Sequence, residues 1–318
     1  MTRPQVSVII NNYNYGRFLG RAIDTALDQP GVTAEVIVVD DGSSDDSRDI
    51  IARYGDRIVP VLQDNAGQAA AINAGVHHSR GAILSFLDAD DWWAPGKLAA
   101  TVKAFDADAD VGLAYHRLQP LLSDGTVAFR PIPPSLCDGD LAPRLVRSAG
   151  RWPFPMTSAV SVRRSLWDRV GDIPADFRIS ADAWLVGLYP FVCNVAALPD
   201  ALGFYRIHDN TWYRAVDDAA MLRKRVAHWQ ATVAATNAFL HREGLPWRLD
   251  PADHVPSRIA SARLDGARLP DKLRLIRLGL RDQGEPHPLR RLRDTLRDVR
   301  AVGSTPMSSP AATAVPSS

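Results

Sequence analysis

The sequence contains little of several features that mark whole classes of protein. Only two of its 318 residues are cysteine, Cys137 and Cys193, and neither has a Cys-x-x-Cys neighbour. This argues against a disulfide framework or a thiolate zinc site and favours a reducing compartment. No run approaches the roughly 20 apolar residues that span a bilayer, and the N-terminal MTRPQVSVII lacks the apolar core of a signal peptide. We expect a cytoplasmic protein, peripheral at most to the inner face of a membrane.

An excess of one charge is also missing. The chain has 37 Lys and Arg against 36 Asp and Glu, a net charge of +1, so nothing predicts a nucleic-acid partner, which needs a strongly basic face. Four signature motifs are absent as well: a P-loop, a Gly-x-Gly-x-x-Gly after the first strand, a Gly-x-Ser-x-Gly elbow and a His-Glu-x-x-His pair. Any nucleotide or catalytic site must therefore be built from other residues.

The first hundred residues show alternating strand and helix patterns. Short β-branched runs at residues 6–10 and 36–39 are typical of buried parallel strands. Apolar residues at helical spacing lie between them, and Ser44 or Asp45 is placed to cap the second helix. We predict strands at residues 6–10, 36–39, 58–62 and 82–87, and helices at 15–27, 44–53, 67–78 and 95–105. This order predicts an α/β fold with a mostly parallel central sheet and helices on both faces.

The rest of the chain divides into a mixed and a helical part. From residue 111 to about 210 we predict strands at 111–116, 156–162 and 201–207, helices at 164–170 and 181–189, and a turn-rich stretch at 118–135. After residue 214 only helical patterns follow, at 215–243, 255–282 (one or two helices) and 288–300. We therefore predict a catalytic-type domain over 1–213, a helical appendage over 214–302 and a disordered Ser/Pro/Ala-rich tail over 303–318.

Acidic residues follow the predicted strands at three places. Ligands of parallel sheets bind beyond the carboxyl ends of the strands, and crowded carboxylate oxygens suit Mg²⁺ or Mn²⁺. Aspartates also populate turns and helix caps, which is the simpler explanation for an isolated pair. Turns and caps explain less well why three acidic residues lie within four positions directly after an apolar strand. The clusters are Asp40 with Asp41, then Asp88 with Asp90 and Asp91, and Asp182 at the start of a helix.

Six segments in register carry a family resemblance over residues 4–213. They are VSVIINNYNYGRFLGRAIDTAL, EVIVVDDGSSDDS, DNAGQAAAINAGVHHSRGAILSFLDADDWWAPGKL, SVRRSLWDRVGDIPADF, SADAWL and FYRIHDN. In this order they resemble a family 2 glycosyltransferase. The resemblance implies the GT-A fold and an enzyme, a hexosyltransferase or related sugar transferase. Such an enzyme moves a sugar from a nucleotide-diphosphate donor to a hydroxyl acceptor with inversion.

The resemblance also implies which residues hold the donor. Tyr13 would pack on the base, and Asp41 would accept a hydrogen bond from an imide N–H such as uracil N3–H, which favours a UDP-linked donor. Asp40 would hold that loop or the ribose. The other donor-side residues would be Asn12, Asn65, Gly67, Gln68, Asn73 and Asp88. Simpler roles remain open, an Asx-turn for Asp41 and caps or exposed polar positions for Gln68 and Asn73.

The metal and the catalytic base follow from the same resemblance. Asp88, Asp90 and Asp91 match the family's metal motif, of which Asp90 and Asp91, with His208, would hold Mn²⁺ or Mg²⁺ against the donor diphosphate. Asp182 would be the base that takes the acceptor proton, with helix capping as the alternative. Two positions depart from the family pattern. Ala181 stands where relatives carry Glu, and Ile72 stands where many carry a basic residue, so one diphosphate contact is in doubt.

The acceptor is left open by the sequence, and two other functions compete. A growing glycan or a lipid-linked saccharide of the cell envelope would suit the Arg-rich helices after residue 255, which can contact an anionic membrane or form a solvated helical cap. A sugar-phosphate nucleotidylyltransferase would need a Gly-rich phosphate loop where this chain has NNYNYGRF. A non-catalytic nucleotide-sugar binding protein would not need the base Asp182.

Overall fold

Two compact units make up the chain. The computed structural model describes residues 3–175, 181–208 and 218–303. The first unit comprises Met1–Arg144 and Trp152–His208, and the second, called here the helical unit, comprises Leu145–Arg151 and Asp209–Ser318. The single boundary expected after residue 213 is thus replaced by one after His208, and the segment Leu145–Arg151 joins the helical unit. The predicted disordered tail lies, from residue 304 on, outside the described residues.

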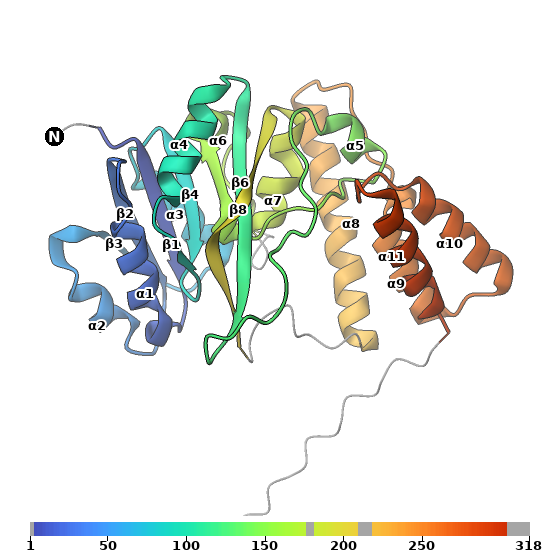
Figure 1. The fold of residues 1–318 in the computed structure, drawn as a ribbon, viewed down its shortest axis with the longest axis horizontal. Helices are drawn as coiled ribbons and strands as arrows, with labels where there is room; N and C mark the ends of the chain where they lie inside the picture. Colours follow the sequence, from blue (N-terminus) through green and yellow to red (C-terminus); the bar gives the residue numbers. More distant parts are fainter. Residues whose placement is uncertain (1–2, 176–180, 209–217, 304–318) are drawn as a thin grey trace, which may run out of the picture. The chain divides into compact units, whose positions relative to one another are not determined.

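An eight-stranded sheet forms the centre of the first unit (Figure 1). Its order is β3-β2-β1-β4-β7-β6-β8-β5. The first four strands are parallel, β7 runs antiparallel to both β4 and β6, β8 is parallel to β6, and β5 is antiparallel to β8. The strands are β1 (Val6–Asn12), β2 (Ala34–Asp41), β3 (Val59–Gln63), β4 (Ile83–Asp88), β5 (Trp92–Trp93), β6 (Val111–Leu122), β7 (Val160–Arg163) and β8 (Asn194–Ile207).

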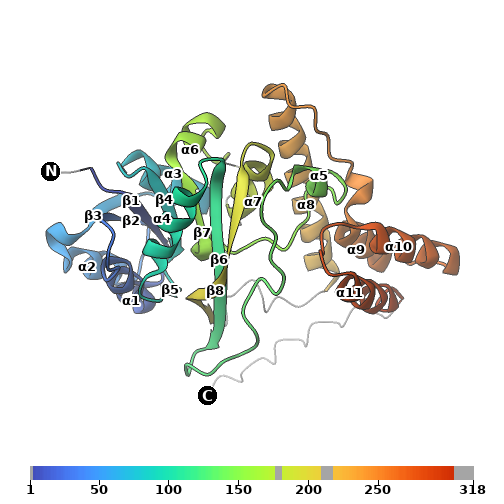
Figure 2. The ribbon, with the colours of Figure 1, turned by 45° about the horizontal axis from the view of Figure 1, so that its top comes forward.

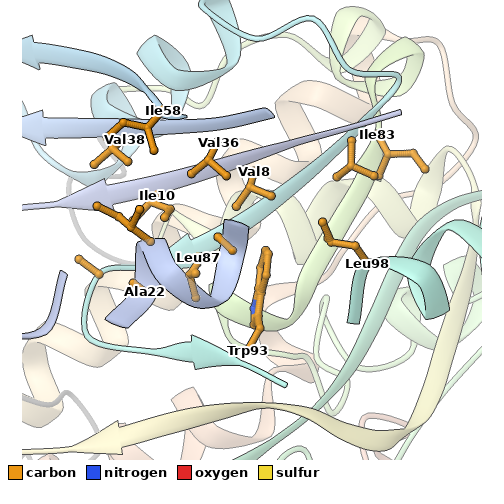
Figure 3. Packing of buried hydrophobic residues seen from close by; sticks show 14 of the residues in the cluster. Val8, Ile10, Ala22, Val36, Val38, Ile58, Ile83, Leu87, Trp93 and Leu98 are labelled. Carbon is orange, nitrogen blue, oxygen red and sulfur yellow. The ribbon is translucent and has the colours of Figure 1, made fainter. Parts of the chain in front are cut away.

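Helices cover both faces of this sheet because alternate strand residues point to opposite sides. Val8, Val38 and Leu98 belong to a core cluster that includes residues of α1 and α4 (Figure 3). On the other face α3 lies so close that a Cβ on Gly75 would stand 2.4 Å from Ile9 Cγ2. The helices of this unit are α1 (Gly16–Leu27), α2 (Ser47–Ala52), α3 (Gln68–His77), α4 (Lys97–Ala107), α6 (Arg164–Val170) and α7 (Asp182–Leu188), while α5 (Ala142–Val146) is divided between the two units. The predicted α/β architecture is confirmed.

Two local predictions were wrong, and one short strand was missed. Residues 118–122 continue β6 instead of forming turns, because β6 and β8 pair along their whole length while β7 has already ended. On the side away from β8, residues 126–132 pair with this part of β6, and the Pro120 carbonyl accepts from the N–H of Ala128. The two-residue strand β5 was not anticipated. The helix expected from Ser44 or Asp45 begins at Ser47. The Asp45 carboxylate accepts from the N–H of Ser47 with Oδ1 and from the N–H of Gly16, at the start of α1, with Oδ2.

The helical unit contains α8 (Ala219–Arg242), α9 (Val255–Asp265), α10 (Leu269–Arg281) and α11 (Pro288–Arg300). Its core joins α9, α10 and α11, which lie together in Figure 2, through Val255, Ile259, Leu275, Val299 and Val302. Helices α10 and α11 touch where a Cβ on Gly279 would meet the Thr295 side chain at 2.5 Å. Among the described residues no helix is both long and apolar enough to cross a membrane.

Candidate active site

The carboxyl ends of β1, β2, β3 and β4 meet at one edge of the sheet because these strands are parallel. Two further elements reach this edge from later in the chain. The short 3₁₀ helix before the antiparallel β7 brings Ser158 beside β4, and the end of β8 brings His208 beside Asp90. Most of the predicted site residues are therefore neighbours in space.

Asp41 is buried and anchors the loop that follows β3. Its Oδ1 accepts from the N–H of Ala66 at 2.8 Å and from Gln63 Nε2 at 2.7 Å, and its Oδ2 accepts from the N–H of Gly67 at 2.8 Å. Asn65 Nδ2 donates to the Asp41 carbonyl at 3.0 Å. Since each carboxylate oxygen has two lone pairs, Oδ2 keeps one acceptor position for a ligand.

Asp40 is fully buried and holds its own loop. Its Oδ1 accepts from Asn12 Nδ2 at 3.0 Å, and its Oδ2 accepts from Arg48 Nε at 2.9 Å and from the N–H of Ser43 at 3.1 Å. Asp40 thus makes its hydrogen bonds within the protein, and its predicted role toward the donor stays a prediction. Beside it Tyr13 is 49% exposed, so its ring remains available to a ligand.

Asp88 connects the end of β4 with β1 and with α3. Its Oδ1 accepts from Asn11 Nδ2 and from Gln68 Nε2, both at 3.0 Å. Gln68 Oε1 in turn accepts from the N–H of Ala181 at 3.1 Å, so one glutamine links the acidic motif to the residue before Asp182. Burial, and then the neighbouring charge of Asp90, raise the pKa of Asp88 to about 7.

Asp90 and Asp91 have different surroundings. Asp90 Oδ2 lies 2.9 Å from His208 Nε2, and its side chain keeps 15% of its surface exposed. Asp91 is buried and has both oxygens bound by protein, since Oδ2 accepts from Ser158 Oγ at 2.6 Å and Oδ1 from the N–H of Arg206 at 3.0 Å. Burial, followed by the charges of Asp90 and Asp88, raises the pKa of Asp91.

Asp90 and His208 bind each other in this motif, and their predicted role as metal ligands stays a prediction. Asp91 sits behind them as a support. Within the part of the chain that the structure describes, no group of three His, Cys, Asp or Glu side chains is arranged to hold a metal ion by itself. The crowding of carboxylates that raises the pKa of Asp88 is the kind of charge that a bound cation relieves.

Asp182 is the first residue of α7, with Ala181 at the cap position. Burial raises the pKa of its carboxyl to about 6, although the backbone N–H groups of Ala183 and of Asp182 itself oppose the shift. A carboxylate that titrates near neutral pH is suited to accept a proton from a hydroxyl group.

Asn73 is held by a loop from elsewhere in the first unit. Its Nδ2 donates to the Ile173 carbonyl at 2.9 Å, and its Oδ1 accepts from the N–H of Ile173 at 3.0 Å. Both ends of the amide are thus used to fasten this loop to α3. Its predicted place on the donor side stays a prediction.

Four residues of the site escaped the sequence analysis: Asn11, Arg48, Gln63 and Ser158. Ser158 binds the carboxylate of Asp91 and accepts from the N–H of Asp88 at 3.1 Å. No local signal marks it, because its position depends on β7 pairing antiparallel with β4. Arg48, by contrast, lies eight residues after Asp40, and a search for cations near that acid would have found it.

Arg206 fixes the acidic loop from the side of β8. Its Nε donates to the Asp90 carbonyl at 2.9 Å. Its guanidinium lies 4.3 Å from the ring centre of Phe18 and 4.5 Å from that of Trp92, distances at which a cation is attracted to an aromatic face. Arg206 therefore positions the loop that carries Asp90 and Asp91.

Comparison with known proteins identifies the family. The model of Glycosyl transferase family 2 matches residues 7–126. An uncharacterized glycosyltransferase of Nostoc sp. (strain PCC 7120) is 35% identical over 263 residues, which cover 80% of this chain and 81% of that protein. The chain belongs to glycosyltransferase family 2. The succinoglycan biosynthesis protein ExoO of Rhizobium meliloti is 30% identical over 256 residues, 76% of this chain and 70% of its own length.

Two solved structures show that this family 2 glycosyltransferase has the GT-A fold. Residues 1–349 of S. aureus TarS, in complex with UDP-GlcNAc, match with a TM-score of 0.55 and 15% identity over 93% of this chain and 82% of theirs. The mannosyltransferase PcManGT from Pyrobaculum calidifontis, in complex with GDP-Man and Mn²⁺, matches with a TM-score of 0.53 and 20% identity. The match covers 94% of this chain and 87% of PcManGT. The predicted family, fold and enzyme class are confirmed.

Proposed function

We propose that this glycosyltransferase moves a sugar from a UDP-linked donor to a hydroxyl acceptor with inversion at the anomeric carbon. One observation carries the proposal. Gln68 donates to Asp88 and accepts from the N–H of Ala181, which joins the predicted metal motif to the predicted base Asp182. A diphosphate and an acceptor hydroxyl would meet between these two groups.

The uridine of the donor would lie against Tyr13, Asp41 and the loop Asn65–Gly67. The open lone pair of Asp41 Oδ2 suits an imide N–H, which uracil has and cytosine lacks at that position. Gly67 has φ 95°, a backbone conformation that favours glycine, and it presents its N–H to Asp41. Asn12 and Asn73 would act indirectly, through Asp40 and through the Ile173 loop. TarS, described with UDP-GlcNAc, supports the choice of nucleotide.

A divalent cation, Mn²⁺ or Mg²⁺, would be held by Asp90 and His208, with Asp91 fixing the loop from behind. The carboxylate of Asp90 suits Mg²⁺ or Mn²⁺, and PcManGT is described with Mn²⁺. When bound, the cation stabilises the negative charge that develops on the leaving nucleoside diphosphate.

Asp182 would act as the general base. Its carboxylate takes the proton of the acceptor hydroxyl while the hydroxyl oxygen forms a bond to the anomeric carbon. The bond from that carbon to the diphosphate oxygen breaks on the opposite side, and UDP leaves with the bonding electrons. A single displacement of this kind inverts the configuration.

The acceptor would be a growing glycan or a lipid-linked saccharide of the cell envelope. The similarity to a succinoglycan biosynthesis protein supports a polysaccharide product. The basic helices α10 and α11 would bring the enzyme to the membrane where lipid-linked acceptors reside.

A donor screen tests the proposal. The protein is incubated with Mn²⁺ and UDP-, GDP- or dTDP-sugars, and release of nucleoside diphosphate is measured with and without EDTA. We expect release from UDP-sugars only, and its loss with EDTA. The proposal is contradicted if the protein neither binds any of these donors nor releases nucleoside diphosphate from them. Pyrophosphate release from a nucleoside triphosphate would indicate a nucleotidylyltransferase instead.

A further inference from the structure

Helix α10 exposes a row of leucines. Leu269, Leu273 and Leu280 keep 70%, 59% and 44% of their surface exposed. At about 100° per residue these side chains fall within an arc of roughly 40°, on the side away from the buried Leu275 and Gly279. A soluble helix ordinarily turns such a stripe toward its core, whereas here the core stripe is a separate one.

An arginine row runs beside the leucines and lines a cavity. Arg274, Arg277 and Arg281 are exposed and occupy an arc of roughly 60° on the wheel, centred about 90° from the leucine row. With Arg147 they surround a cavity of about 270 Å³ that Leu278, Asp253 and Asp282 also line. In the described part of the chain, Arg147, Arg277 and Arg281 have neither an ion pair nor a side-chain hydrogen bond.

The acidic groups near this cavity leave its positive charge largely uncompensated. Asp282 is buried and paired with Arg151, and Asp271 pairs with Arg274 at 3.6 Å. On the α10 wheel both aspartates lie nearly opposite the leucine row. Asp253 is the other acidic residue that lines the cavity. Burial, and to a smaller extent the negative charge of Asp250, raise the pKa of its carboxyl. Leucines, arginines and acids thus occupy three separate sectors.

Helix α11 continues the same chemistry. Its first turn adds Leu289, which is 83% exposed, and Arg291 Nη1 donates to the Leu280 carbonyl at 3.4 Å, which ties this turn to the end of α10. Over residues 269–300 nine Lys and Arg stand against five Asp and Glu. Exposed leucines flanked by arginines are the composition of a helix that lies in a membrane interface.

We propose that α10 docks on an anionic bilayer, with Leu269, Leu273 and Leu280 in the acyl boundary and a lipid phosphate in the cavity of Arg147, Arg274, Arg277 and Arg281. The docking of α10 rests on the membrane contact in the proposed function, and it specifies which residues make that contact and which lipid group they bind. Guanidinium groups bind phosphate oxygens in a fork of parallel hydrogen bonds. The exposed leucine row beside the cavity favours a lipid phosphate over a free one.

Vesicle flotation tests the docking with the full-length protein. Wild type is compared on phosphatidylcholine vesicles with and without phosphatidylglycerol. We expect binding that needs phosphatidylglycerol and weakens with salt. Arg277→Gln with Arg281→Gln should lower the partition coefficient on the order of tenfold or more, because each basic residue near the surface contributes to it. Leu273→Gln with Leu280→Gln should lower it similarly by removing apolar insertion.

A matched control loses the same charge elsewhere. Arg53→Gln with Lys103→Gln removes two exposed cations of the first unit, for which the structure gives no ion pair among the described residues, and it should bind like wild type. The proposal is overturned if the control loses as much binding as the α10 variants, if phosphatidylcholine alone binds equally, or if only inorganic phosphate binds. Titration of UDP with Mn²⁺ reports separately on the donor site, so failure of docking and failure of the proposed function are distinguishable.

Discussion

Asp182 is the residue on which the proposed chemistry depends most directly. Asp182→Asn keeps the shape of the side chain but removes its ability to accept a proton. We expect kcat to fall about 10²–10⁴-fold with UDP affinity unchanged, measured by UDP release and by calorimetry. Unchanged turnover would remove the base assignment, and a lost affinity for UDP would point to a structural role instead.

The pH dependence of the rate reports on the same carboxyl. Burial raises the pKa of Asp182 to about 6, and only the ionised form can take a proton. Activity should therefore be full above pH 7 and fall about tenfold per unit below pH 6. Initial rates between pH 5 and 8 at saturating Mn²⁺ check this, and a profile that stays flat to pH 5 would contradict it.

Asp90 and His208 should determine metal affinity, whereas Asp91 should determine the stability of the loop. His208→Gln and Asp90→Asn remove the two proposed ligands, so Mn²⁺ should bind at least tenfold more weakly in the presence of UDP. Asp91→Asn disturbs the buried bonds to Ser158 and Arg206 and should lower the melting temperature as well. Calorimetric Mn²⁺ titration and thermal melts separate the two effects, and equal behaviour of Asp90 and Asp91 variants would refute the division.

At the scale of elements, the packing of α3 on the sheet depends on the absence of a side chain. A Cβ on Gly75 would overlap Ile9 Cγ2 and press on Val39 Cγ2 at 3.1 Å. Gly75→Ala should therefore destabilise the protein by about 1–3 kcal/mol and shift α3 with its Gln68. Urea unfolding measures the loss.

Gly20 of α1 is the matched control for that substitution. The nearest atom to a Cβ there is the Tyr54 hydroxyl at 3.6 Å, an ordinary contact. Gly20→Ala should leave stability unchanged or raise it by about 0.5–1 kcal/mol, since alanine favours a helix interior. If Gly20→Ala and Gly75→Ala destabilise the protein equally, the close packing of Gly75 against the sheet is not the cause of the effect.

At the scale of the molecule, the two compact units should respond differently to the donor. The predicted UDP and Mn²⁺ residues all belong to the first unit, so ligand should stabilise the transition in which that unit unfolds. At about 100 times Kd the gain is about 2.7 kcal/mol, a rise of several degrees. Differential scanning calorimetry with UDP, CDP and EDTA checks this. An equal rise with CDP would contradict the uracil preference, and no loss with EDTA would contradict a metal requirement.

The first four strands, their helices and the acidic clusters at the strand ends were predictable from the sequence. Their signals are local, since β-branched runs and helical periodicity appear within about ten residues. The later part of the sheet was harder to predict. The lengths of β6 and β8 depend on their pairing with each other across about 80 residues. No sequence pattern within either segment predicts these lengths.

The chemistry of the carboxylates divides in the same way. That Asp88, Asp90 and Asp91 lie together after a buried strand, and that leucines and arginines alternate along α10, can be read from the sequence without any tertiary contact. Long-range contacts determine that Ser158 and Arg206 bind the oxygens of Asp91, that Asp90 pairs with His208, and that the leucines of α10 are exposed. Local patterns fix which residues share a strand end or a helix face. Hydrogen bonds between residues 60 to 120 positions apart fix which partner each carboxylate has.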